Sequence, residues 1–353
     1  MSVKPVITQL LAQLPAHCVI SDAEELRPYE CDALSAYRKL PLAVVIPETV
    51  EQIRTALLIC SENGVPVVAR GAGTGLSGGA LPHTEGILLS LAKFNRIIDI
   101  DPQNRTARVQ PGVTNLAISK AAAAYGLYYA PDPSSQLACS IGGNVAENAG
   151  GVHCLKYGLT THNIQALEVL TIDGESLTIG SQALDAPGYD LMALLTGSEG
   201  LLAITTEVTV KLLPCPEVAQ VVMASFDSVD AAGAAVTATI ASGIIPGGLE
   251  LLDRPAIEAV EKFINTGYPK DAAAILLCEL DGTQADVSAQ IERVRQVFTE
   301  AGATSQQVSR DEQERQRFWA GRKAAFPAMG RLSPDYYCMD GTIPRKHLAH
   351  VLN

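Results

Sequence analysis

The residues best suited to chemistry in this sequence are the glycines of the segment RGAGTGLSGG, which spans residues 70–79. Glycine loses more conformational freedom on folding than any other residue, so five glycines in ten positions indicate positive φ angles or a close approach to a ligand. Successive unobstructed N–H groups form an anion-binding nest, which suits a diphosphate. Thr74 and Ser77 add hydroxyl donors. We therefore predict a diphosphate site here rather than a glycine-rich turn without a ligand.

The same segment also matches the dinucleotide-binding pattern of nicotinamide enzymes. Gly73, Gly75 and Gly78 have the GxGxxG spacing, and Asp99 or Asp101 follows at a suitable distance. That fold requires the third glycine to open a helix. The residues after Gly78 instead lead through a turn into an apolar run, so the sequence argues against a simple nicotinamide-binding fold.

A second glycine-rich region consists of PDPSS (131–135) and CSIGGNVAENAGG (139–151). Its Asn144 and Asn148 side chains can both donate and accept hydrogen bonds. Such mixed donors beside bare backbone suit the edge of a flat heterocycle and a polyol. Two separate glycine-rich loops in one domain favour a long ligand with distinct parts, and FAD fits this description better than a nucleoside phosphate.

The elements that must position these loops alternate between short apolar runs and amphipathic segments. A capping box at Thr49 predicts a helix over 50–62 that ends at Gly64, and Val65 begins a strand that leads into the first loop. Asp173-Gly174 predicts a hairpin turn within 166–180. The remaining elements expected before Pro214 and Pro216 are strands at 42–47, 86–91, 97–101, 105–110 and 201–214 and a helix at 115–125.

The second half of the sequence predicts an α+β unit. A helix followed by a turn is expected at 226–246, further helices at 284–302, 313–326 and from 344 onward, and strands at 272–282 and 336–344. Residues 3–30 indicate a helical leader. The expected organisation is a helical leader over 1–40, an FAD-binding domain over 41–215 and a substrate or cap domain over 216–353, which we expect to be incomplete at its C-terminal end.

Composition narrows the class of protein. A formal charge of −12 without a basic run argues against a nucleic-acid partner. The sequence predicts no integral membrane segment and no secretion signal, and the eight cysteines form no CxxC pair, which favours reduced thiols in the cytoplasm. His347 and His350 could share a helix face, but no ligand cluster accompanies them, so no metal site is predicted.

The two glycine-rich regions, together with GSEGLLAITTEVTVKLLP (197–214), closely resemble the FAD domain of the vanillyl-alcohol oxidase superfamily. Within it, the sequence is similar to bacterial glycolate oxidase flavoprotein subunits and D-lactate dehydrogenases. The resemblance covers most of residues 41–214. It implies two α+β subdomains that hold FAD and a cap domain with an antiparallel sheet.

The resemblance also implies which residues bind the cofactor. The first loop would hold the diphosphate, the second would lie along the flavin and ribityl chain, and a third group would complete the adenine side. The implied cofactor-binding residues are Arg70, Gly71, Ala72, Gly73, Thr74, Gly75, Leu76, Ser77, Pro131, Asp132, Ser134, Ser140, Gly143, Asn144, Ala146, Gly150, Tyr157, Gly158, Glu199, Gly200 and Ile204.

Relatives with covalently attached flavin carry a histidine in the first loop. This sequence has Gly73-Thr74 there, so non-covalent FAD is expected. His153 and Cys154, near the second loop, are expected to pack rather than to attach the flavin. Arg322, in the segment FWAGRK, resembles the family's substrate-binding arginine and would hold a carboxylate in a bidentate pair. Cys338 stands where some relatives have a further lysine.

The family's metal-binding and catalytic histidines lie in a C-terminal section that this sequence does not contain, so the catalytic base is unknown. The resemblance implies an FAD-dependent dehydrogenase of a small 2-hydroxy acid, glycolate or D-lactate, with companion FAD and iron–sulfur subunits. A location in the cytoplasm or at the inner face of the membrane follows. The alternatives are a flavin-binding protein without catalysis, a D-2-hydroxyglutarate-type dehydrogenase and a relative of ether-lipid synthases.

Overall fold

The computed structural model describes residues 4–181, 183 and 188–352. The chain forms two compact units. The first contains Met1–Gly151 and Gly158–Cys215, and the second contains Val152–Tyr157 and Pro216–Asn353. The short segment 152–157 was expected in the FAD-binding domain and packs with the second unit instead. No sequence pattern marked it, because its partners lie more than 90 residues further along the chain.

The first unit begins with a small sheet in the order β1-β2-β4-β3. Strands β2 and β3 run parallel to β4, and β1 pairs antiparallel with β2. Thr49 accepts a hydrogen bond from the Gln52 N–H and so caps α2, while Gly64, at φ 62°, ends it. The elements are α1 (Lys4–Gln13), β1 (Val19–Ile20), β2 (Ala43–Val45), α2 (Val50–Asn63), β3 (Val67–Arg70) and β4 (Ile87–Ser90).

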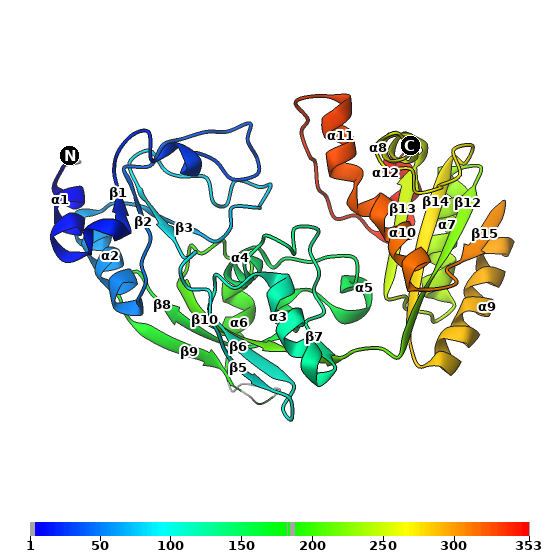
Figure 1. Cartoon of the computed structure of the whole chain (residues 1–353), viewed down its shortest axis with the longest axis horizontal. Coiled ribbons are helices and arrows are strands. Elements are labelled where there is room, and N and C mark those ends of the chain that lie inside the picture. The colour runs from blue at the N-terminus through cyan, green and yellow to red at the C-terminus, as the bar shows by residue number, and fades with distance from the viewer. Residues whose placement is uncertain (1–3, 182, 184–187, 353) are drawn as a thin grey trace. The chain divides into compact units, whose positions relative to one another are not determined.

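The first unit also contains an antiparallel sheet in the order β5-β6-β10-β8-β9 (Figure 1) and a two-stranded antiparallel sheet of β7 and β11. The hairpin between β8 and β9 turns at the predicted position, with Gly174 at φ 76°. The elements are β5 (Ile97–Asp101), β6 (Thr106–Val109), α3 (Asn115–Ala122), β7 (Leu127–Tyr128), α4 (Ile141–Glu147), β8 (Ile164–Leu170), β9 (Ser176–Gly180), α6 (Leu191–Leu195), β10 (Ile204–Lys211) and β11 (Leu213–Pro214).

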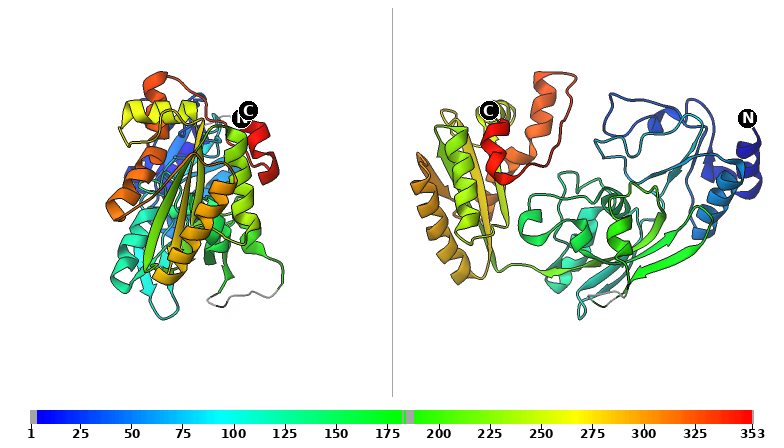
Figure 2. Two further views of the ribbon diagram at one scale, coloured as in Figure 1. Left: turned by 90° about the vertical axis from the view of Figure 1, so that its right-hand side faces the viewer. Right: turned by 180° about the vertical axis from the view of Figure 1, so that it is seen from behind.

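The second unit is one antiparallel sheet, β13-β14-β12-β15, with helices packed on both faces. Helices α7 and α9 cover one face, as Figure 2 shows, and α8, α10 and α11 pack against the other. The elements are α5 (Cys154–Tyr157), β12 (Val218–Phe226), α7 (Val229–Ala241), β13 (Gly248–Asp253), α8 (Arg254–Phe263), β14 (Ala274–Gly282), α9 (Gln284–Glu300), β15 (Ser305–Val308), α10 (Glu312–Lys323), α11 (Ala325–Leu332) and α12 (Leu348–Leu352).

The α+β class and its antiparallel sheets are confirmed, but two local predictions are wrong and one helix was not predicted. In the described part of the helical leader, residues 4–40, α1 is the one α-helix, because Pro15 follows it and Val19 then pairs with Val45 in the first sheet. Residues 336–344 form no strand, and Tyr336, Tyr337 and Met339 are exposed. The second glycine-rich region contains the helix α4, which its glycines concealed.

Candidate cofactor-binding site

A cleft of about 1110 Å³, including its open mouth, lies within the first unit. The cleft is open on one side, and its lining residues come from separate segments of the chain, which suits an elongated ligand. Both glycine-rich regions and the segment after α6 contribute to its walls. The predicted residues that line it are Arg70, Gly71, Ala72, Gly73, Thr74, Gly75, Ser140, Gly143, Asn144, Ala146, Glu199, Gly200 and Ile204.

Some predicted residues do not line this cleft in the part of the chain that the structure describes. Seven of them belong to the first unit, and the eighth, Tyr157, belongs to the second unit. These eight are Leu76, Ser77, Pro131, Asp132, Ser134, Gly150, Gly158 and Tyr157. The prediction named no residue of the wall formed by Pro111, Pro133, Ser135, Cys139, Gly142, Glu147 and Ser198.

The first glycine-rich loop offers bare main chain to the cleft. It leaves β3 at Arg70, and a Cβ added at Gly75 would meet no atom closer than 4.0 Å, so open space borders the backbone there. Gly73 has a φ of 69° and lies against the Arg70 guanidinium. That guanidinium donates to the Cys31 carbonyl at 2.7 Å, so Arg70 supports the loop from below. The fold thus needs glycine at Gly73 for its conformation and leaves Gly75 free to approach a ligand.

Helix α4 forms the opposite wall. Ser140 caps it, with its Oγ accepting from the Gly143 N–H at 3.3 Å, and a Cβ at Gly71 would collide with that Oγ. Ile141 and Val145 bury the other side of the helix in the core. Packing therefore stabilises a helix that its glycines would otherwise disfavour.

The two asparagines of this region hold the wall together. The Asn144 Oδ1 accepts from Asn115 Nδ2 at 3.0 Å, and the Asn148 Oδ1 accepts from the Thr161 N–H at 3.1 Å. Asn148, at φ 49°, ends α4 in the left-handed conformation. Asn144 lines the cleft, and the oxygens of both side chains fix the loop.

The third wall is hydrogen-bonded to the end of α4. The Gly197 N–H donates to the Val145 carbonyl and the Glu199 N–H to the Ala146 carbonyl, each at 2.8 Å. Glu199 has a φ of 54°, an unusual conformation for a residue with a side chain. The tie to α4 holds this turn at the edge of the cleft.

Carboxylates gather at this edge. A Cβ at Gly79 would lie 2.5 Å from the Glu147 Oε1 and 3.4 Å from the Glu199 Oε2, so the two side chains converge on one point. Partial loss of hydration, followed by repulsion from Glu199 and Asp32, raises the pKa of Glu147. Asp32 is buried, and its Oδ2 has no hydrogen-bond partner among the described residues. Glu147 and Glu199 therefore place negative charge at this edge of the first loop, while the Arg70 guanidinium lies against the loop at Gly73 and attracts Asp32.

The second unit holds the other predicted residues. The Tyr157 hydroxyl donates to Asp281, and His153 Nε2 lies 2.9 Å from Glu279 Oε1, so packing accounts for both side chains. Arg322, on α10, donates from Nε to Glu250 Oε2 at 2.8 Å. The structure therefore gives the predicted carboxylate-binding arginine a partner within the protein.

One group of possible metal ligands was missed because it forms only in space. His17, Cys18 and Glu48 place their ligand atoms within 4.8 Å of one another, outside the cleft. Burial raises the pKa of the Cys18 thiol, and the repulsion of Glu48 adds to this rise. Metals bind the thiolate, so the setting disfavours a ligand role. His347 and His350 are exposed on η5 (Arg345–His347) and α12.

Among the described residues, no helix combines the length and apolar character that crossing a bilayer requires.

Comparison with protein families gives two successive matches. An FAD binding domain matches residues 41–180, and the C-terminal domain of FAD linked oxidases matches residues 215–353. The chain is 64% identical to the glycolate oxidase subunit GlcD of Escherichia coli K12, covering 98% of this chain and 70% of that protein. It is 31% identical to a D-lactate dehydrogenase of Anaerostipes hadrus, covering 93% of this chain and 70% of that protein.

Solved structures show the same fold at low identity. The chain is similar to 4-ethylphenol oxidase from Gulosibacter chungangensis, with a TM-score of 0.77 at 18% identity, over 94% of this chain and 72% of that one. An alkyldihydroxyacetonephosphate synthase gives a TM-score of 0.76 at 17% identity, over 94% of this chain and 64% of that one. The cleft lining fits FAD, because bare loop backbone borders open space at Gly75 and the walls come from three separate segments. The chain belongs to the FAD-linked oxidases, the family of the glycolate oxidase subunits GlcD.

Proposed function

We propose that this chain is the FAD-carrying part of a dehydrogenase that oxidises glycolate or D-lactate to the 2-oxo acid. The single observation that carries the proposal is the 64% identity to GlcD over 98% of the chain. The similarity to a D-lactate dehydrogenase keeps the substrate class at small 2-hydroxy acids. Bound FAD would supply the hydride acceptor.

The residues of the first unit would bind and orient the cofactor. The main-chain N–H groups of Gly71, Gly73 and Gly75 would hold the diphosphate. Gly143 and Ala146 on α4 would lie along the middle of the ligand, and Glu199, Gly200 and Ile204 would border its far end. No histidine lies in the first loop, which favours dissociable FAD.

Arg322 is the proposed substrate-binding residue. Its Nε donates to Glu250 at 2.8 Å, and this single bond would leave the two Nη groups to meet a substrate carboxylate. Glu250 would then fix the guanidinium plane. The proposal extends to companion FAD and iron–sulfur subunits that receive the electrons, because the relative is a subunit by name. Such a complex would place the chain in the cytoplasm, peripheral to the inner face of the membrane.

An anaerobic spectroscopic experiment tests the function. Glycolate or D-lactate added to the FAD-loaded protein is expected to bleach the visible flavin band. Arg322→Lys is expected to raise the substrate concentration needed for half-maximal bleaching about tenfold, because lysine cannot form the bidentate pair. Arg295→Lys, an exposed arginine on α9, is the matched control. An unchanged band with both acids would favour a flavin-binding protein without this catalysis.

A further inference from the structure

The second unit contains one segment from the middle of the first unit's sequence, residues 152–157, which we name the strap. The chain leaves the first unit after Gly151 and returns to it at Gly158. Close to both points, the Ala149 carbonyl accepts from the N–H and the Oγ1 of Thr160, at 3.2 and 2.7 Å. Ala149 lines the cleft, and its own N–H donates to Asn144 in α4. The strap is therefore three residues away from the cofactor cleft along the chain.

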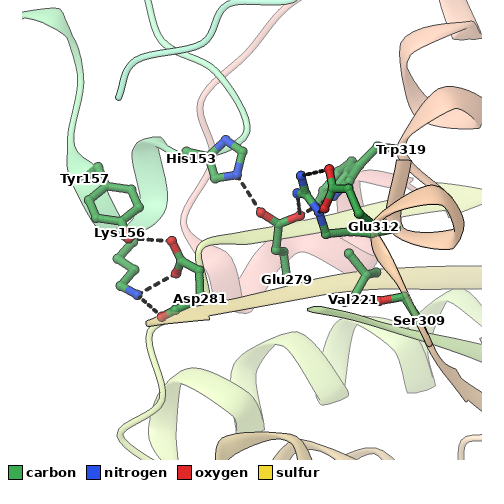
Figure 3. A network of polar contacts seen from close by, with 10 residues as sticks. His153, Lys156, Tyr157, Val221, Glu279, Asp281, Ser309, Glu312 and Trp319 are labelled. Atoms are coloured by element: carbon green, nitrogen blue, oxygen red, sulfur yellow. Dashed lines mark hydrogen bonds and ion pairs between the residues drawn. The ribbon is translucent and has the colours of Figure 1, made fainter. Parts of the chain in front are cut away.

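Two buried carboxylates of β14 hold the strap on the second unit (Figure 3). Glu279 and Asp281 are two positions apart, so both side chains point to the same face of the sheet. Glu279 Oε1 lies 2.9 Å from His153 Nε2. Asp281 accepts from Lys156 Nζ through its side chain and, at 2.8 Å, through its carbonyl. It also accepts from the Tyr157 hydroxyl.

The strap also fits the sheet closely. A Cβ added at Gly248 on β13 would lie 2.5 Å from Val152 Cγ1, so the strap contacts the sheet where the side chain is missing. Val152 packs against the hydrophobic cluster that contains Trp319. An apolar contact of Val152 and the ion pairs with Glu279 and Asp281 thus hold the six residues of the strap.

Two further hydrogen-bond donors explain why the Glu279 carboxylate remains charged. Arg315 donates to its Oε2 at 2.7 Å and the Trp319 indole donates to the same atom. Burial alone would raise the pKa of Glu279, but the bonds from His153, Arg315 and Trp319 lower it to about 2. Such a pre-organised anion can hold the strap in one position.

We propose that the strap couples the second unit to the cofactor cleft, with Glu279 and Asp281 as the positioning residues that fix Ala149 and the end of α4. The proposal rests on the proposed placement of FAD in the cleft and not on the identity of the substrate. Coupling is reciprocal, so FAD bound to the first unit must also stabilise the strap-bound second unit.

The test measures FAD affinity of the full-length protein after its flavin is removed. Glu279→Gln with Asp281→Asn is expected to raise the FAD dissociation constant about tenfold. The matched control is Glu314→Gln, a buried carboxylate of the same unit that binds Arg310 and Arg317 and does not touch the strap. It is expected to change the dissociation constant less than twofold. Equal effects in both variants, or none in either, would overturn the proposal.

Hydrogen exchange supplies a readout that loss of stability alone would not move. In the wild-type protein, FAD is expected to slow exchange in β14, and in the double variant this slowing should vanish while that of the first loop persists. If the double variant does not fold, Lys156→Met serves in its place, because Tyr157 still donates to Asp281. Unaltered slowing in β14 would contradict coupling. Failure of the wild-type protein to take up FAD would overturn the proposed function as well.

Discussion

Carboxylates in the two units differ in how many donors meet their charge. Glu279 in the second unit accepts from His153, Arg315 and Trp319, and its pKa falls to about 2 although burial opposes this. In the cleft of the first unit, no side-chain hydrogen bond to Glu147 or Glu199 occurs among the described residues, and the pKa of Glu147 rises. The hydrogen-bonded carboxylate Glu279 stabilises the fold of the second unit. The cleft carboxylates lack such donors within the described part of the chain, which marks the cleft as a place where a ligand can supply them.

The largest expected effect concerns the matched carboxylate. The pKa of Glu279 is lowered from an ordinary 4.5 to about 2, so its stabilisation is complete above pH 4.5 and disappears as the pH falls toward 2. The loss amounts to about 3 kcal/mol. Glu279→Gln should remove this part of the acid sensitivity. Urea unfolding, followed by the fluorescence of Trp319, the one tryptophan of the chain, measures the free energy of unfolding at each pH. An unaltered dependence of this free energy on pH in the variant would refute the assignment.

The next effect concerns the wall of the cleft. A Cβ at Gly142 would lie 2.5 Å from Pro111 Cβ and 3.0 Å from the Pro111 carbonyl oxygen, so Gly142→Ala must displace α4. We expect FAD affinity to fall about 100-fold, about 2.7 kcal/mol. Gly341→Ala, where no atom lies within 4 Å, is the control. Absorbance titration with FAD distinguishes the two, and equal affinities would show that α4 tolerates displacement.

A smaller effect is expected from the caps of two helices. Ser140 caps α4 beside the cleft, and Ser228 caps α7 in the second unit. Each serine-to-alanine change should destabilise its unit by about 1 kcal/mol. Ser140→Ala alone should also weaken FAD binding, by about fivefold, because α4 forms the cleft wall. A loss of affinity in Ser228→Ala of the same size would mean that the effect is general instability.

The smallest effect concerns the unmatched carboxylates. Glu199 and Asp32 repel the charge of Glu147, which lies at the edge of the first loop, where the FAD diphosphate would bind. Glu147→Gln removes this negative charge, so FAD affinity should rise about two- to threefold at neutral pH. Because the pKa of Glu147 is raised, its carboxylate ionises as the pH rises through the raised pKa, and its repulsion of the FAD diphosphate grows with ionisation. The variant should therefore flatten the decline of FAD affinity with pH. Weaker binding by the variant would instead indicate that Glu147 accepts hydrogen bonds from the ligand.

The sequence predicted those features that depend on neighbouring residues. The cap at Thr49, the end of α2 at Gly64 and the hairpin turn at Gly174 follow from local chemistry, and the structure confirms them. The first glycine loop was likewise visible as a ligand site. Helix α4 was not, because its two glycines disfavour a helix that only the packing of Ile141 and Val145 stabilises.

Features that depend on distant residues were beyond the sequence. Nothing near His153 indicated that Glu279 would meet it 126 positions later. Arg322 could be assigned to a substrate carboxylate by resemblance, but its bond to Glu250 required the fold. The strand predicted at 336–344 failed for a related reason, since an apolar run forms a strand only where a partner strand is available.

The chain passes between its two units at residues 151–152, 157–158 and 215–216. A gene fragment that begins at Pro216 would therefore encode the second unit without His153, Lys156 and Tyr157, and would leave Asp281 buried without these donors. Chimeras that exchange this unit between relatives should carry the hexapeptide 152–157 along with it. Recombination at a single junction is thus disfavoured, and the two units are expected to have been inherited together.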